Sequence, residues 1–77
     1  MGIIMNYTFI NSDDDIDWLQ QTHLRAFKFP WHPESAVIYG NEDFPTMIEL
    51  YRDKDPRRYY DSIVLSWCEE TEQYEAE

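Results

Sequence analysis

Three side chains of the types that bind transition metals or act as nucleophile and base occur in the chain: His23, His32 and Cys68. A zinc site uses about four ligands, or three and a water, and these residues show no paired ligand spacing. A reactive thiolate needs a positive environment, whereas Glu69 and Glu70 directly follow Cys68. We therefore expect His23 to be a hydrogen-bonded core residue and Cys68 to be a structural thiol.

The alternating aspartates near the amino-terminal end have the spacing with which a calcium-binding loop opens. Asp13, Asp15 and Asp17 would supply the first oxygen ligands. The match then fails, because Trp18 stands where the loop requires glycine and Leu24 stands where it requires a bidentate glutamate. The pattern does not predict a calcium site, and we expect neither a metal nor a cofactor.

Composition excludes several classes of function. The chain has 77 residues, with 16 Asp and Glu against six Lys and Arg, and a formal net charge of -10. This charge opposes phosphate binding, so direct contact with nucleic acid is not expected. No run approaches the ~20 apolar residues of a membrane span, and residues 2–5 are too short for a secretion signal. Glycine occurs only at Gly2 and Gly40, too few for a phosphate loop, and we expect no enzymatic activity.

The cysteine content bears on the compartment and the oligomeric state. Cys68 is the only cysteine, so no intramolecular disulfide can form. This agrees with a cytoplasmic location and leaves open a homodimer linked through Cys68.

The elements that must position these side chains can be read from the hydrophobic pattern. Alternation over residues 3–10 predicts a strand, and Ser12 followed by acids predicts the start of a helix that ends near Phe27. Apolar runs at residues 36–39, 46–52 and 59–67, separated by turn residues, predict three further strands. The expected fold is α+β, a small single domain over residues 1–68, with the order β-α-β-β-β and one helix packed on an antiparallel sheet.

The carboxyl-terminal part of the chain allows two interpretations. Asp55 and Pro56 suit the first positions of a helix, and a helical stripe of apolar residues follows them, so residues 56–72 could instead be helical. Residues 69–77 contain five glutamates and no base, which predicts an acidic tail that is dispensable for folding.

The strongest functional feature is the distribution of acids. Four lie within residues 13–17 and five within residues 69–77, and neither run contains a base. One explanation is local, because aspartates stabilise the start of a helix and glutamates keep a protein soluble. The other is that complementary anionic surfaces speed and orient the encounter with basic proteins.

The position of Trp18 supports the explanation that the acids belong to a surface for basic proteins. It lies about 200° around the expected helix from Ile16, at ~100° per residue, so it should face away from the core. An exposed tryptophan among carboxylates resembles an interface hot spot, although Trp18 could also pack under the connector at residues 30–33 or the acidic tail. The candidate partner-binding residues are Asp13, Asp14, Asp15, Asp17, Trp18, Glu69, Glu70 and Glu72.

In size, acidity and aromatic content the chain is similar to the small inhibitors encoded by phages and mobile elements, some of which imitate DNA. The similarity is one of composition and extends to no motif. It implies an inhibitor of the anti-restriction or anti-CRISPR type, a DNA mimic that occupies a basic, nucleic-acid-binding surface of a partner protein or nuclease complex. The alternatives are an immunity or antitoxin partner of a basic toxin, and a small structural adaptor.

Overall fold

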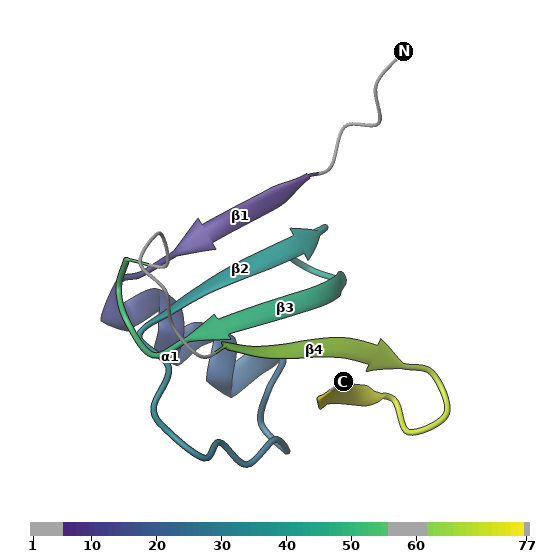
Figure 1. Cartoon of the computed structure of the whole chain (residues 1–77). Helices are drawn as coiled ribbons and strands as arrows, with labels where there is room; N and C mark the ends of the chain where they lie inside the picture. The colour runs from purple at the N-terminus through teal and green to yellow at the C-terminus, as the bar shows by residue number, and fades with distance from the viewer. Residues whose placement is uncertain (1–5, 56–61, 77) are drawn as a thin grey trace.

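The structure, a computed structural model, describes residues 6–55 and 62–76, and Figure 1 shows one helix lying against a twisted antiparallel sheet. This confirms the α+β class and the small single domain. The predicted beginnings of the first strand at residue 3 and of the last strand at residue 59 lie outside the described residues. The elements in chain order are β1 (Tyr7–Ile10), α1 (Asp13–Thr22), β2 (Ser35–Gly40), β3 (Pro45–Tyr51), β4 (Ser62–Cys68) and β5 (Gln73–Ala76).

The helix begins where its sequence predicts. The Ser12 side chain accepts a hydrogen bond from the Asp15 backbone N–H at 3.2 Å, which satisfies one of the amide groups that an α-helix leaves unpaired at its start. Asp13, Asp14 and Asp15 occupy the first turn, where the helix dipole favours negative charge.

The helix ends at Thr22, earlier than the predicted end near Phe27. His23 is the C-cap, and the backbone N–H groups of His23 and Leu24 both donate to the Leu19 carbonyl, at 3.0 and 3.2 Å. These bonds close the last turn. Leu24 then turns into the core and is 2% exposed, so burial of this leucine takes the place of a further helical turn.

The sheet has the order β1-β2-β3-β4-β5, and each strand pairs antiparallel with its neighbour in sequence. The predicted order of elements lacked β5. Residues 73–76 had been expected within an acidic tail, but they pair with β4 in the register Trp67 opposite Tyr74. The helical interpretation of residues 56–72 is wrong for Ser62–Cys68, which form β4, and its first part at residues 56–61 lies outside the described residues.

The core lies between α1 and the sheet face turned toward it. Figure 1 shows α1 lying against one face of the sheet. Ile16 and Leu19 are the buried residues of α1, and they form one cluster with alternate residues of the strands. No helix among the residues that the structure describes is long and apolar enough to cross a membrane. The buried hydrophobic residues are Ile10, Ile16, Leu19, Leu24, Ala36, Ile38, Ile48, Leu50, Leu65 and Tyr74.

Candidate protein-binding site

A groove of about 820 Å³ lies at the carboxyl-terminal end of α1. Three segments far apart in the sequence meet there: the end of α1 with the residues after it, the β2–β3 turn, and the end of β4 with the β4–β5 turn. We call it the acidic groove, because it has three carboxylates and one guanidinium on its walls. Its lining residues are Thr22, His23, Arg25, Ala26, Asp43, Phe44, Pro45, Thr46, Trp67, Glu69, Glu72, Gln73 and Tyr74.

Four aromatic rings form a continuous chain, of which His23, Tyr74 and Trp67 line the groove and Trp18 lies beside it. The ring centroid of His23 lies 5.5 Å from that of Trp18 and 6.0 Å from that of Tyr74, and Tyr74 lies 5.2 Å from Trp67. All three contacts are edge-to-face, the arrangement that the ring quadrupoles favour. Trp18 is 39% exposed, as predicted from its position on the helix, and the chain of rings connects it to the groove.

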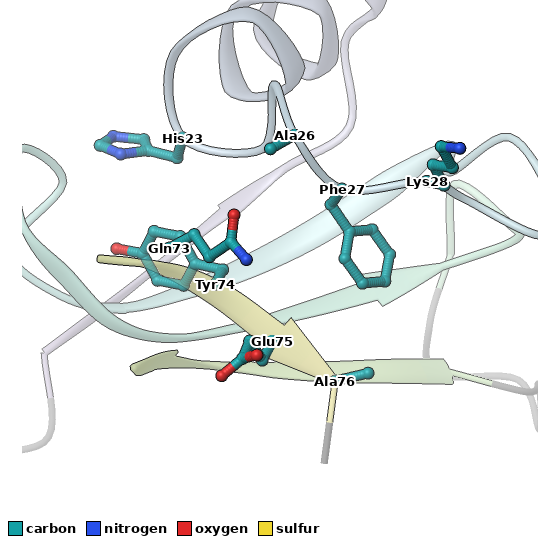
Figure 2. Close-up of a pocket in the computed structure, with 8 residues that line it drawn as sticks. All are labelled: His23, Ala26, Phe27, Lys28, Gln73, Tyr74, Glu75 and Ala76. Carbon is teal, nitrogen blue, oxygen red and sulfur yellow. The ribbon is translucent and has the colours of Figure 1, made fainter. Parts of the chain in front are cut away.

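Tyr74 holds this chain of rings in place. It is 6% exposed, and its hydroxyl donates to the Pro45 carbonyl at 2.6 Å, which ties β5 to the start of β3. Figure 2 shows Tyr74 between β5 and the segment that follows α1. It lines a smaller hollow of about 340 Å³, which shares His23, Ala26, Gln73 and Tyr74 with the acidic groove. The His23 Nε2 donates to the Glu42 carbonyl at 3.0 Å, so His23 is hydrogen-bonded as predicted, but it is half-buried at the end of α1 and does not belong to the core.

The β4–β5 turn carries the second acidic run. The Glu72 N–H donates to the Cys68 carbonyl at 2.8 Å, and Glu72 has a φ of 54°. A non-glycine residue rarely adopts this left-handed conformation. Glu69 and Glu72 line the groove, whereas Glu70 lies exposed in the same turn. Half-buried Cys68 precedes the turn.

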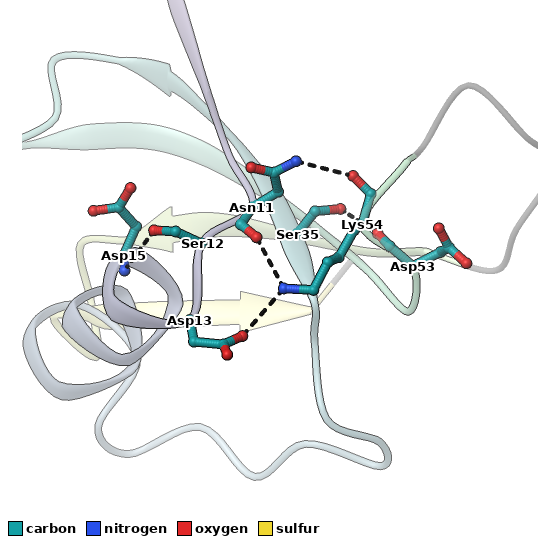
Figure 3. Close-up of polar contacts among 7 residues, drawn as sticks. All are labelled: Asn11, Ser12, Asp13, Asp15, Ser35, Asp53 and Lys54. Carbon is teal, nitrogen blue, oxygen red and sulfur yellow. Dashed lines mark hydrogen bonds and ion pairs between the residues drawn. The ribbon is translucent and has the colours of Figure 1, made fainter.

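The first acidic run lies away from the groove. Asp13, Asp14 and Asp15 occupy the opposite end of α1, which at ~1.5 Å per residue is about 15 Å away. The Lys54 Nζ lies 3.1 Å from an Asp13 carboxylate oxygen, and it also donates to the Asn11 carbonyl at 3.1 Å (Figure 3). Asp13 therefore helps to join the start of α1 to the segment after β3.

Of the residues that line the groove, only Glu69 and Glu72 were predicted from the sequence as partner-binding residues, and Asp43 and Phe44 are among those that were not. The β2–β3 turn that carries them is held by two contacts to Asn41, whose side chain accepts from the Asp43 N–H at 2.8 Å and whose carbonyl accepts from the Phe44 N–H at 3.0 Å. Gly40 enters this turn with a φ of 88°. Phe44 is 82% exposed, and a large apolar side chain within a turn was the available signal.

Within residues 6–55 and 62–76, no three His, Cys, Asp or Glu side chains are grouped so that they could hold a metal ion. The three alternating aspartates Asp13, Asp15 and Asp17 lie along α1 and do not form a loop.

The sheet face opposite α1 carries a second group of polar and aromatic side chains. The Tyr39 hydroxyl donates to Glu49 Oε1, and the Tyr39 ring lies 6.2 Å from that of Tyr7. The hydrogen bond to Glu49, with burial and the negative charge of Glu49, raises the pKa of Tyr39 to about 12. Burial and Glu49 also raise the pKa of Tyr51.

This pKa shift predicts that the protein loses stability at high pH. Because the folded pKa of Tyr39 lies above the ordinary value near 10, the contribution is complete below about pH 10 and is lost as the pH rises toward about 12. Urea unfolding at about pH 9 and 11.5 measures the fall in the free energy of unfolding. The fall should be smaller in Tyr39→Phe and in Glu49→Gln, and equal pH dependence in all three proteins would contradict this assignment.

Comparison of the chain with protein-family models, with curated proteins and with solved structures gives no match.

Proposed function

We propose that the protein binds a basic surface of a partner protein, one that otherwise holds nucleic acid. Its carboxylates would take the place of phosphates, and the protein would act as an inhibitor of the DNA-mimic type, directed at a nuclease such as a restriction or CRISPR enzyme. The single observation that carries the proposal is the acidic groove, where carboxylates and exposed aromatic rings from three segments meet.

The composition of the groove suits a protein interface. Aromatic residues dominate interface hot spots, and polar groups around them exclude water and direct the encounter. Phe44 and Trp67 are exposed in the groove, next to Asp43, Glu69 and Glu72. An uncharged hydrophobic partner would leave these carboxylates without compensation, which favours a basic partner.

The spread of the acids suits a surface that holds nucleic acid. Carboxylates lie at both ends of α1, in its first turn and in the acidic groove. The length of α1, about 15 Å, corresponds to about four base-pair steps of 3.4 Å along the axis of duplex DNA. A cationic surface built for a row of phosphates could therefore face both groups at once.

The proposal is tested by capture of the partner from the native host, its identification by mass spectrometry, and kinetic measurement of the complex. We expect association to slow at least tenfold between about 0.05 and 0.5 M salt, because exposed charges are screened. Duplex DNA should compete for the partner. An association rate independent of salt would refute the electrostatic account, and a ternary complex without mutual weakening would refute mimicry.

Two matched double variants locate the surface, since each removes two negative charges. Glu69→Gln with Glu72→Gln should weaken the complex about tenfold, mainly by faster dissociation, because these carboxylates line the groove. Asp14→Asn with Asp15→Asn should slow association at low salt and leave dissociation nearly unchanged. If the aspartate variant instead speeds dissociation and the glutamate variant only slows association, the interface lies at the start of α1.

A further inference from the structure

We propose that the acidic groove accepts an arginine side chain of the partner, an inference that rests on the proposed function and names the group recognised. The groove is large enough, at about 820 Å³, and it offers what a guanidinium requires: flat aromatic walls for its faces and carboxylates for its N–H groups.

One aromatic wall is fixed before any partner arrives. Trp67 is 44% exposed, and its ring meets that of Tyr74 edge-to-face at 5.2 Å. Tyr74 is itself held by its bond to the Pro45 carbonyl. Because this wall is already ordered, binding would not have to immobilise it.

The second wall is Phe44, which the hydrogen-bonded β2–β3 turn presents almost entirely to solvent. A guanidinium on these aromatic walls gains cation–π attraction, and its N–H groups remain free in the ring plane to reach Glu69 or Glu72. Lysine matches the charge but not the shape, because its ammonium is compact and strongly hydrated. The protein already contains one contact of this kind, with the Arg52 guanidinium 5.6 Å from the centroid of the Trp31 ring.

The net negative charge of the groove also favours a cationic side chain. Among the lining residues that the structure describes, Arg25 is the only Lys or Arg, against Asp43, Glu69 and Glu72. Arg25 should repel an incoming cation, so its removal offers a test in which binding improves.

The test uses blocked single amino acids as probes of the full chain labelled with ¹⁵N. N-acetyl-arginine methylamide should shift the indole N–H signal of Trp67 in a saturable manner, with a dissociation constant in the range of about 1 to 50 mM, as expected for one cation–π contact with carboxylates. The citrulline analogue has nearly the same shape without the charge and should give no saturable shift, and the lysine analogue should bind several-fold more weakly. Equal shifts from arginine and citrulline, or none, would overturn the proposal.

Substitutions in the groove test whether the arginine probe binds there. Phe44→Ala and Glu72→Gln should each weaken the arginine probe about fivefold, and Arg25→Gln should strengthen it about twofold. Phe9→Ala is the matched control, because Phe9 is exposed but lies on the sheet face opposite α1, and it should change nothing. If Phe9→Ala has the effect expected of Phe44→Ala, the probe does not bind in the groove.

The two proposals fail separately. A captured basic partner with salt-dependent association, whose affinity is unchanged by Phe44→Ala, would refute the arginine site and leave the proposed function intact. A saturable arginine probe without any basic partner would refute the proposed function.

Discussion

Removal of residues 69–77 is expected to abolish the cooperative thermal unfolding transition. Their described part includes β5, which pairs with β4 and places Tyr74 in the core at 6% exposure. Loss of a buried aromatic side chain costs about 3 to 5 kcal/mol, a large share of the stability of a small domain. Circular dichroism during heating measures the transition. This outcome is the opposite of the dispensable tail that the sequence alone predicts.

Two substitutions at one position separate packing from hydrogen bonding. Tyr74→Ala should lose about 3 to 5 kcal/mol of the free energy of unfolding. Tyr74→Phe keeps the ring but removes the bond to the Pro45 carbonyl, and should lose about 1 to 2 kcal/mol.

A chain truncated after residue 68 that melts cooperatively within a few degrees of the full chain would contradict the first prediction and show that β5 adds nothing to stability.

Substitutions at two adjacent residues of α1 should separate stability from binding: one should mainly lower the free energy of unfolding, and the other should mainly weaken the complex. Leu19 is 0% exposed, and Leu19→Ala should cost about 3 to 5 kcal/mol of the free energy of unfolding. Trp18 is partly exposed and touches His23 edge-to-face, so Trp18→Ala should cost only about 1 kcal/mol. If Trp18 belongs to the interface, the same change should weaken the complex with the captured partner by about 2 kcal/mol or more.

The comparison is made with urea unfolding and with binding kinetics on the same preparations. His23→Ala is a useful third variant, because it removes the ring that connects Trp18 to Tyr74 and leaves the indole itself in place. A Trp18→Ala protein with severely reduced stability and normal affinity would make Trp18 a structural residue and remove it from the site.

Local chemistry accounts for the elements that could be predicted. Ser12 caps the helix because its hydroxyl meets an amide three residues away, and the strands at residues 35–40 and 45–51 follow from alternation between turn residues. Strand β5 could not be predicted in this way. It has only one buried side chain, Tyr74, among exposed polar and acidic neighbours, and it is stabilised by contacts with Trp67 and Pro45 elsewhere in the chain.

The candidate site was predictable only in part, for a similar reason. Trp18 and Glu72 could be selected as an exposed aromatic and an acid of the carboxyl-terminal run, but nothing local relates them to each other. Glu72 lines the groove and Trp18 contacts its lining residue His23, because α1 ends at Thr22 and the β4–β5 turn lies beside that end. Phe44 was missed because an apolar residue in a turn carries no periodicity that would mark its exposure.

The position of strand β1 at an edge of the sheet links the net charge of the protein to its tendency to aggregate. Among the described strands β1 pairs only with β2, and its residues, Tyr7, Thr8, Phe9 and Ile10, are uncharged and of types that favour strands. Such an edge can template the addition of another chain, and at neutral pH the net charge of -10 keeps copies apart. Near the sequence pI of about 4.3 the net charge vanishes, and this repulsion vanishes with it. We therefore expect the protein to aggregate through the β1 edge more readily in acid steps of purification than at neutral pH.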